Sequence, residues 1–298
     1  MNTVTVVIPT VGRWASLGRC VASLDQQTSG PVPTICVLND VRSRPLRTLD
    51  RPWLRYIAEP RRSVGVARNA GAYAADSTWI LFTDDDCVVP KTWLAEILTF
   101  LANNPSMDIA GGPVTEPQRP EGRYRFMRAL NYMHDARSMK MRPGGVPSLG
   151  AANLLVRRSA LLSLGGFDGD LPSTEDYELL VRAKVAGHRI GTYLNATPVQ
   201  HSHETSIVGF CRRYWSYGRG VAAVVAKHRL DPADHRMTGS GSLFAFASDV
   251  KQFRNKDLAW IKEHYGDTTG AMRLWASLRA VAWQAGRQIE SRRRHRPR

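Results

Sequence analysis

The stretch WILFTDDDCVVP, residues 79–90, sets an apolar run directly against three consecutive aspartates. A short apolar run of this kind predicts a buried strand. Adjacent carboxylates repel one another and are costly to bury without a counter-charge. We therefore expect the aspartates to lie at the end of a core strand and to face a positively charged partner.

The chain around this stretch alternates between strand-like and helix-like patterns. Expected strands lie at 4–10, 34–40, 54–60 and 79–86, and expected helices lie near 17–24, 64–75 and 92–104. Such alternation predicts an α/β fold with a mostly parallel sheet flanked by helices. Ligands bind beyond the carboxyl ends of the strands in such sheets, and these ends carry polar and acidic side chains here. The sequence therefore predicts a ligand crevice at that edge of the sheet.

The pattern changes after residue 115, which divides the chain into three expected parts. Residues 1–115 form a ligand-binding half, and residues 116–204 form a second half of the same domain, with a strand at 152–158. A helix is expected after Ser173 or Thr174, which are good N-cap residues, with Gly187 after its end. Residues 205–298 form a helical extension that closes with a basic tail.

Charge and cysteine usage narrow the class of protein. The net charge of +15 and the pI near 10.2 indicate anionic partners such as phosphates, nucleic acid or an acidic membrane surface. A GC-rich genome gives the same excess of arginine without any function attached. The four cysteines are scattered without a CxxC, which argues against a disulfide framework or a zinc cluster and favours a reducing compartment. The sequence shows neither a signal-peptide pattern nor an apolar run of membrane-spanning length. We therefore expect a cytoplasmic protein.

The three aspartates suggest a metal site. Successive side chains of a strand point to opposite faces, so Asp84 and Asp86 share one side and Asp85 turns away. Two converging carboxylates suit a hard divalent cation, Mn²⁺ or Mg²⁺, which keeps positions open for water and substrate phosphates. The alternative is that the aspartates simply end a strand in solvent.

Six motifs together resemble a known family. They appear in the order and at roughly the spacing of the family two nucleotide-sugar glycosyltransferases, over residues 4 to about 220: VVIPTVGR (6–13), VLND (37–40), VGVARNAG (64–71), ILFTDDD (80–86), LGGFDGDLPSTEDYELLVRAKVAGHRI (164–190) and HSH (201–203). The resemblance implies a GT-A fold with a Rossmann-like nucleotide-sugar half and an acceptor half. It also implies an inverting single displacement, in which an acceptor hydroxyl attacks the anomeric carbon of an NDP-sugar.

The resemblance also implies roles for individual residues. Donor-binding residues would be Pro9, Thr10, Arg13, Asp40, Arg68, Asn69, Asp84, Asp85 and Arg213. Asp40 would accept a hydrogen bond from a uracil or thymine base, which favours UDP- or dTDP-sugars. The metal would be held by Asp86 and Asp84 with His201 or His203. The second strand departs from the family pattern, since Asn39 and Val41 replace an expected acid and glycine, and this makes the base less certain than the metal.

Asp176 has two interpretations. Glu175 and Asp176 are first-turn acids that the helix dipole favours. The match of EDYEL to the family motif instead makes Asp176 the general base, with Glu175 orienting the acceptor. The segment FCRRYWSYGRG adds Arg212, Arg213 and Arg219 as candidates for stabilising the leaving diphosphate, and Arg213 is taken as the donor-binding one.

Other functions fit the sequence less well. A nucleotidyltransferase would need a glycine-rich phosphate loop after the first strand, where PTVGRWAS holds a single glycine. A binding protein for nucleic acid would need a recognisable module, and the acidic cluster would repel a phosphate backbone. Processive synthases carry membrane spans and a Q-x-x-R-W motif, whereas CRRYW lacks the glutamine, so one sugar per encounter is expected.

The acceptor and the C-terminal helix stay open at this level. The acceptor is either a soluble small molecule, such as a natural-product scaffold, or a lipid-linked, cell-envelope glycan. One helical face would hold Met272, Trp275, Leu278, Ala282 and Ile289, with arginines around it. Such a helix either packs on the rest of the protein or lies on an anionic membrane at the inner face. Packing is favoured, because the core of the chain offers a nearer apolar partner.

Overall fold

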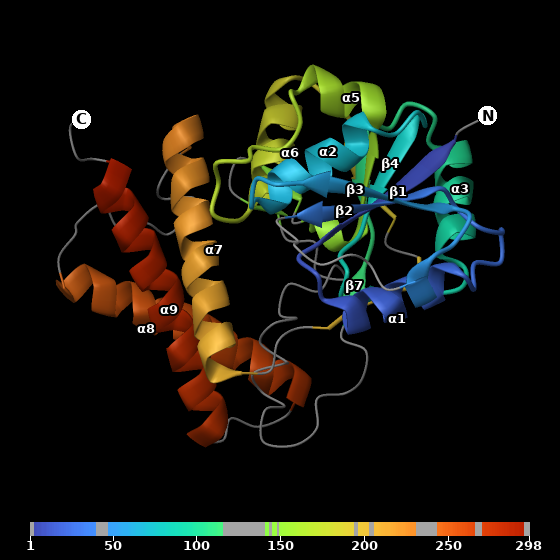
Figure 1. The fold of residues 1–298 in the computed structure, drawn as a ribbon. Coiled ribbons are helices and arrows are strands. Elements are labelled where there is room, and N and C mark those ends of the chain that lie inside the picture. Colours follow the sequence, from blue (N-terminus) through green and yellow to red (C-terminus); the bar gives the residue numbers. More distant parts are fainter. Residues whose placement is uncertain are drawn as a thin grey trace.

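A seven-stranded sheet forms the core of the larger, right-hand part of the computed structural model (Figure 1). The structure describes residues 3–39, 47–115, 141–142, 145–147, 149–193, 196–202, 206–230, 243–265 and 270–294. The strand order is β11-β6-β10-β4-β1-β2-β3. The strands are β1 (Val4–Thr10), β2 (Thr34–Asn39), β3 (Leu54–Glu59), β4 (Trp79–Phe82), β6 (Ile109–Gly111), β10 (Leu154–Arg157) and β11 (Ile190–Thr192). Asp40 and His203, two of the predicted site residues, lie outside the described residues.

Most neighbours in this sheet are parallel, as the alternation of strands and helices predicts. β1 pairs in parallel with β2 and β4, β2 with β3, and β11 with β6, whereas β10 is antiparallel to both β4 and β6. β10 and β11 follow residue 116 in the chain but join the same sheet as β1 to β4. The predicted α/β class with a mostly parallel sheet is confirmed.

Helices cover both faces of the sheet. Its helices are α1 (Trp14–Leu24), α2 (Val64–Tyr73), α3 (Trp93–Asn103), α5 (Arg158–Ser163) and α6 (Glu175–Val185). Alternate residues of β1 supply the two cores, since Val6 packs with α1 and α3 while Val7 packs with α2, α5 and α6. The small residues of α2 allow close packing, because a Cβ at Gly71 would overlap Val7.

The aspartates lie in a turn, contrary to the prediction of a strand through Asp86. β4 ends at Phe82, and the chain turns through Asp84 to Asp86 before β5 (Cys87–Val88). β5 and β7 (Val114–Thr115) flank β12 (Val199–His201) in a second, three-stranded sheet. Aspartate is disfavoured in buried strands, so the chain leaves the large sheet where the charges begin. Short elements complete the described parts: η1 (Arg47–Leu49), η3 (Ala151–Asn153), β8 (Met141–Arg142) and β9 (Val146–Pro147).

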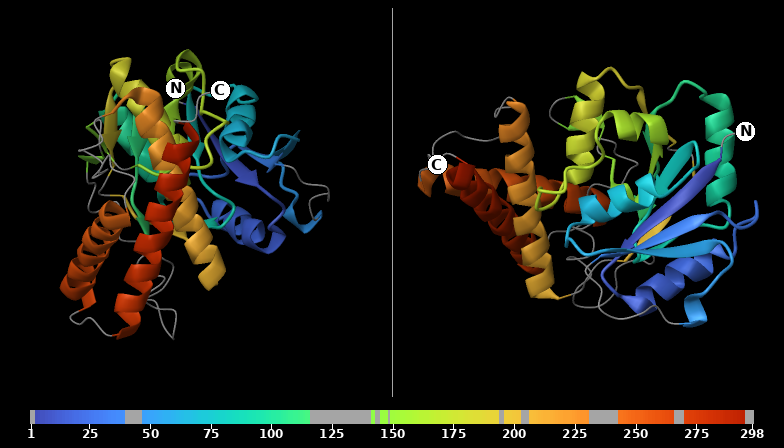
Figure 2. Two further views of the ribbon diagram at one scale, coloured as in Figure 1. Left: turned by 90° about the vertical axis from the view of Figure 1, so that its left-hand side faces the viewer. Right: turned by 45° about the horizontal axis from the view of Figure 1, so that its top comes forward.

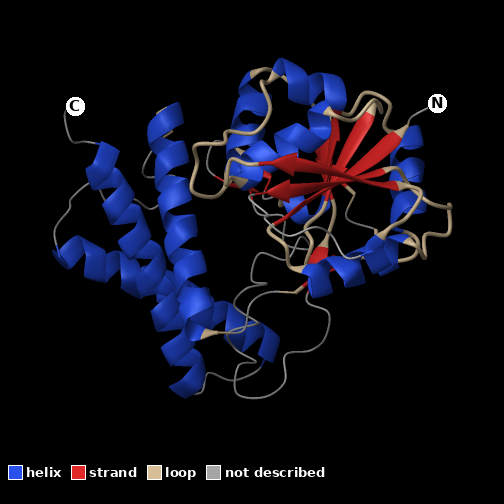
Figure 3. Cartoon of the chain, in the orientation of Figure 1, coloured by secondary structure: helices blue, strands red, loops and turns tan. Residues whose placement is uncertain are grey.

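Three long helices stand beside the sheet-containing part (Figures 2 and 3): α7 (Ile207–His228), α8 (Leu243–Tyr265) and α9 (Gly270–Arg294). Phe210 contacts Trp275, and Tyr214 contacts Arg279 four residues further along both helices, so α7 and α9 run parallel. A Cβ at Gly218 would overlap the carbonyl oxygen of Trp283, which shows how closely the two backbones approach. The buried ion pair of Arg279 with Asp257 ties α8 to them.

The predicted apolar face of α9 is buried at one end and exposed at the other. Trp275 is buried against Phe210 of α7, with ring centroids 5.3 Å apart, and Leu278 and Ala282 are half-buried. Ile289 is 50% exposed. The helix therefore packs on α7 through part of this face. Across the described residues, no helix is long and apolar enough to cross a membrane.

Candidate active site

The parallel register of β1 and β4 brings their carboxyl ends together. Val7 is aligned with Phe82, so Thr10 and the turn after β4 both extend beyond the same edge of the sheet. The Thr10 hydroxyl donates a 2.5 Å hydrogen bond to Asp85. Pro9 precedes Thr10 in the buried part of β1. The predicted ligand edge therefore does collect polar side chains from distant parts of the chain.

Asp85 anchors this edge. Its carboxylate is fully buried and accepts hydrogen bonds from Thr10 and from the guanidinium of Arg13. Burial raises the pKa of Asp85, while the bonds from Thr10 and Arg13 oppose that rise. Arg13 also donates to Asp86 at 2.9 Å. Asp85 is thus buried beside Thr10, and Arg13 joins it to Asp86.

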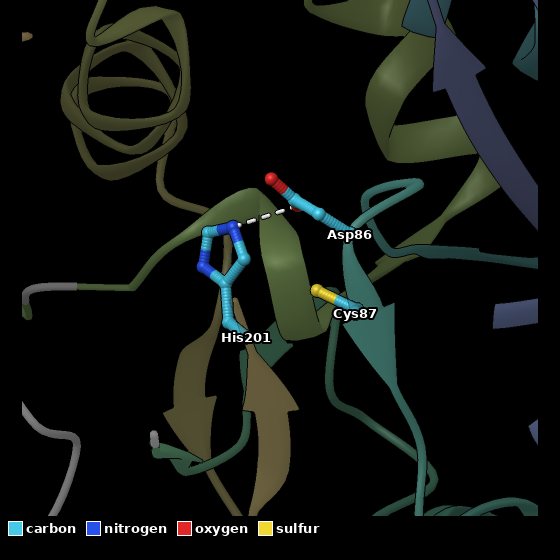
Figure 4. A group of neighbouring side chains, drawn as sticks. All are labelled: Asp86, Cys87 and His201. Carbon is cyan, nitrogen blue, oxygen red and sulfur yellow. Dashed lines mark ion pairs between the residues drawn. The ribbon is translucent and has the colours of Figure 1, made fainter. Parts of the chain in front are cut away.

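Asp84 and Asp86 converge on His201. The Nε2 atom of His201 lies 3.0 Å from Oδ1 of Asp86 and 4.0 Å from Oδ2 of Asp84. Figure 4 shows the imidazole of His201, on β12, directed toward Asp86, which directly precedes β5. The pairing of His201 with Cys87, and a backbone hydrogen bond from Ser202 to Asp86, set this arrangement. Of the two predicted histidines, His201 lies beside the carboxylates, and His203 lies outside the described residues.

This donor set fits a hard divalent cation. The Oδ1 atom of Asp86 is buried, and its neighbour in the structure is Nε2 of His201 at 3.0 Å. Two carboxylates and one imidazole are ligands that Mn²⁺ accepts, with positions left for substrate oxygens. Burial would raise the pKa of Asp86, but the charges of His201 and Arg13 hold it below its ordinary value, so the carboxylate is available as an anion.

Cys87 is a neighbour that the sequence analysis missed. Its sulfur lies within 4.8 Å of ligand atoms of Asp86 and His201 (Figure 4). Burial raises the pKa of the Cys87 thiol well above its ordinary value. Hard cations such as Mn²⁺ and Mg²⁺ prefer oxygen ligands to sulfur. We therefore leave Cys87 out of the candidate metal site.

Arg68 links this site to the start of α6. It is 4% exposed and donates to Asp84 at 2.7 Å and, through its other terminal nitrogen, to Glu175. Burial raises the pKa of Glu175, and Arg68 opposes that effect. Both ends of the guanidinium are thus engaged by carboxylates. The donor contact that the resemblance implies for Arg68 stays a prediction.

Asp176 lies in the first turn of α6 and is only partly buried. One carboxylate oxygen accepts a hydrogen bond from the backbone N–H of Ala151 at 3.2 Å, and the other accepts from that of Tyr177 at 2.7 Å. These bonds orient the carboxylate and leave lone pairs available. The predicted N-cap is Thr174, but its hydroxyl donates to the carbonyl oxygen of Ser173 instead of capping the helix.

Asn69 lies in contact with the loop before α6. Its amide donates to the carbonyl oxygen of Phe167 at 2.8 Å and accepts from the Phe167 N–H at 2.8 Å. This reciprocal pair ties α2 to the loop that leads to α6. The predicted donor contact of Asn69 likewise stays a prediction.

One face of α7 is directed at the sheet-containing part. On this face, Gly220 lies against Ser173 and Val224 packs in the core beside the sheet. Lys227 forms an ion pair with Glu178. Arg213 lies seven residues before Gly220, which places it on the same face. Its Nη1 atom is buried and donates no hydrogen bond to any described residue. A buried guanidinium nitrogen of this kind suits an anionic ligand.

Comparisons with known proteins show the family and the fold of this chain. Over 250 residues the chain is 27% identical to the "Pre-mycofactocin glycosyltransferase" of Mycobacterium tuberculosis, covering 82% of this chain and 52% of that protein, so it spans about half of that relative's length. Mannosyltransferase PcManGT from Pyrobaculum calidifontis, solved with GDP-Man and Mn²⁺, superposes with a TM-score of 0.61 at 16% identity, covering 98% of this chain and 88% of that one. TarS 1-349 of S. aureus, solved with UDP-GlcNAc, gives a TM-score of 0.50 at 14% identity, covering 97% and 90%.

These solved relatives share the GT-A fold, which confirms the fold that the motifs implied. The model of the family "Glycosyltransferase like family 2" matches residues 2–218, which is most of the chain and includes every residue of the candidate site. On this match, the chain belongs to glycosyltransferase family 2.

Proposed function

We propose that this chain is a metal-dependent, inverting glycosyltransferase that moves one sugar per encounter from an NDP-sugar to an acceptor hydroxyl. The observation that carries the proposal is the convergence of Asp84, Asp86 and His201 at the strand ends, joined through Arg68 to the turn that holds Asp176. A nucleotidyltransferase accounts less well for a separate, oriented carboxylate in the first turn of α6.

The metal would be held by Asp86 and His201, with Asp84 beside them. A divalent cation there would neutralise charge on the diphosphate as it leaves. The Mn²⁺ in the solved mannosyltransferase supports Mn²⁺ or Mg²⁺ for this chain. The 3.0 Å distance between Oδ1 of Asp86 and Nε2 of His201 supports the assignment, because both atoms are placed to reach the same ion.

Asp176 acts as the general base in this proposal. It accepts the proton of the acceptor hydroxyl while that oxygen bonds to the anomeric carbon and the bond from carbon to diphosphate oxygen breaks. Attack from the face opposite the leaving group inverts the anomeric centre. The hydrogen bonds from Ala151 and Tyr177 orient the carboxylate before the acceptor binds, which is how positioning lowers a barrier. Arg213 binds the diphosphate through its buried nitrogen.

The donor is a UDP- or dTDP-sugar if Asp40 reads a pyrimidine base. The solved relatives hold GDP-Man in one case and UDP-GlcNAc in the other, so the fold admits both kinds of base. The acceptor is a hydroxyl of a soluble small molecule or of a lipid-linked glycan. Comparing nucleotide-sugars with different bases therefore tests the donor preference directly, without knowledge of the acceptor.

The test is a hydrolysis assay without acceptor. UDP-glucose, UDP-GlcNAc, dTDP-glucose and GDP-mannose are each incubated with the protein and Mn²⁺, and the phosphate products are identified. Release of nucleoside diphosphate that stops on adding EDTA supports a metal-dependent sugar transferase. Release of nucleoside monophosphate with sugar 1-phosphate, which requires cleavage between the two phosphorus atoms, would support a nucleotidyltransferase instead. Preferential use of GDP-mannose would overturn the role of Asp40.

A further inference from the structure

The turn before α6 has an unusual backbone. Thr174, directly before Glu175 and Asp176, has φ 64° and ψ 25°, which is the left-handed region. Threonine is branched at Cβ and rarely adopts this region, because Cβ approaches the backbone too closely. Such a conformation persists only where the surrounding structure holds it. The question is therefore what holds Thr174 in place.

The contacts come from α7. The Ser173 hydroxyl donates to the carbonyl oxygen of Ser216 at 2.8 Å, and the Ser216 hydroxyl donates to that of Pro172 at 3.2 Å. Gly220 faces the same turn one helical turn later. A Cβ at Gly220 would lie 2.5 Å from the Ser173 carbonyl oxygen and 2.5 Å from the Thr174 hydroxyl oxygen, closer than real Cβ atoms come to such groups.

The end of α7 holds the body of α6. Glu178 is fully buried and accepts from Lys227 at 2.6 Å, with the ring of His228 2.9 Å away. Lys227 also donates to Asp168 at 2.9 Å, in the loop that leads to the turn. Asp176 therefore lies between two points at which α7 holds the chain.

We propose that Gly220 is a positioning residue for Asp176, an inference that rests on the proposed role of Asp176 as the base. The missing side chain lets α7 press directly on the Ser173–Thr174 turn. That contact holds Thr174 in its left-handed conformation and so sets where α6 begins and where the Asp176 carboxylate lies. The side of α7 that carries Gly220 then supports the catalytic turn, whereas the side that carries Gly218 packs on α9.

Gly218 provides a matched control for Gly220. Both lie in the middle of α7, but Gly218 faces the backbone of α9 at Trp283, whereas Gly220 faces the catalytic turn. Alanine at either position adds one methyl group in a crowded place and removes the same backbone freedom. A general loss of helix packing predicts the same activity loss from both substitutions. The proposal predicts a loss that is specific to Gly220→Ala.

The first measurement is hydrolysis of the four nucleotide-sugars of the donor panel with Mn²⁺. We expect Gly220→Ala to lower kcat by about 10², the scale of an ångström misplacement, with KM for the donor unchanged. Gly218→Ala should lower Tm while kcat stays near the wild-type value. A wild-type kcat in folded Gly220→Ala, or a parallel loss of kcat and of UDP binding with Mn²⁺, overturns the proposal.

Thr174 supplies a second pair of variants, which tests the same turn without touching α7. Glycine accepts the left-handed region freely, so Thr174→Gly should keep kcat. Thr174→Val has nearly the same size, but it keeps the branched Cβ and loses the hydroxyl that bonds to Ser173, so kcat should fall with Tm little changed. Equal activity of the two variants contradicts the proposal.

A measurement independent of activity separates this inference from the proposed function. Hydrogen exchange followed by mass spectrometry should show faster exchange for residues 173–178 in Gly220→Ala than in Gly218→Ala, with residues 79–90 unchanged in both. If the wild-type protein cleaves none of the four donors, the proposed function fails and the exchange result still decides whether Gly220 holds the turn. Identical exchange at 173–178 in the two variants overturns the inference.

Discussion

The Nε2 atom of His201 lies 3.0 Å from Oδ1 of Asp86, although the two residues belong to different halves of the chain. The relationship depends on the short second sheet, in which β12 pairs with β5 and sets His201 opposite Cys87. It brings two carboxylates, Asp84 and Asp86, and one imidazole together beyond the carboxyl end of β4.

Asp86→Ala should abolish binding of Mn²⁺ and donor cleavage while the fold is retained, because it removes the carboxylate closest to His201. Binding is measured by calorimetry with Mn²⁺, and folding by circular dichroism. Cys87→Ala is the control, since the buried thiol is a neighbour but not a ligand in our assignment. Near-normal turnover in the presence of EDTA contradicts the metal assignment, and loss of Mn²⁺ binding in Cys87→Ala contradicts the exclusion of the thiol.

Asp176→Asn should lower kcat by about 10² or more, because the amide has nearly the same shape but cannot take a proton. KM for the donor should change little, since Asp176 does not contact the nucleotide in the proposal. Asp170→Asn, in the exposed part of the same loop, controls for the loss of one negative charge. A raised KM for the acceptor with an unchanged kcat means that Asp176 binds the acceptor without acting as the base.

Arg213→Ala should weaken donor use by about tenfold to a hundredfold in kcat/KM, the range expected for one charge-assisted hydrogen bond. Arg212→Ala is the matched control, because Arg212 is the adjacent residue and its side chain is exposed. Competition by UDP and by inorganic pyrophosphate should weaken for Arg213→Ala alone. Equal effects of the two substitutions would mean that Arg213 contributes only general positive charge.

Glu178→Gln should destabilise the protein by about 2 kcal/mol at pH 7, because Arg182 and Lys227 lose a charged acceptor. Burial alone would raise the pKa of Glu178, but the bonds from Arg182 and Lys227 lower it below its ordinary value of 4.5. A carboxyl group whose pKa is lowered by folding stabilises the folded state at pH values above its ordinary pKa. This contribution disappears as the pH falls through the pKa of the folded state. The difference from wild type should therefore narrow below pH 4.5. Urea unfolding at several pH values measures it, and a pH-independent difference contradicts the argument.

Trp275→Ala should destabilise the helical extension by about 3 kcal/mol, the usual cost of truncating a buried aromatic side chain. Leu274→Ala is the control, since Leu274 is the preceding residue and is 58% exposed. Thermal unfolding compares the two variants. Equal Tm values would mean that the Trp275 face does not pack on α7, and sedimentation with anionic liposomes would then test that face as a membrane contact.

Local pattern was sufficient for most of the sheet and its helices. The strands predicted at 4–10, 34–40 and 54–60 and the helices near 17–24, 64–75 and 92–104 follow from hydrophobic spacing, which depends on neighbours within a few residues. The strand predicted at 79–86 is present but ends at Phe82. The same local reasoning predicted Asp84 and Asp86 on one side and Asp85 on the other. These residues lie in a turn and not in the predicted strand, so strand alternation does not set their directions.

Tertiary structure decided which side chains meet. Arg68 joins Asp84 to Glu175, although Glu175 lies 107 residues after Arg68 in the chain. No sequence periodicity relates these residues. The left-handed Thr174 is likewise invisible in the sequence, because its conformation is held by α7 and not by its own preference. Spacing along a chain determines which face a residue occupies, whereas a long-range ion pair or a strained turn depends on how whole elements pack. The sequence therefore determined most elements of the sheet, whereas packing determined that His201 meets Asp86 and that Arg68 joins Asp84 to Glu175.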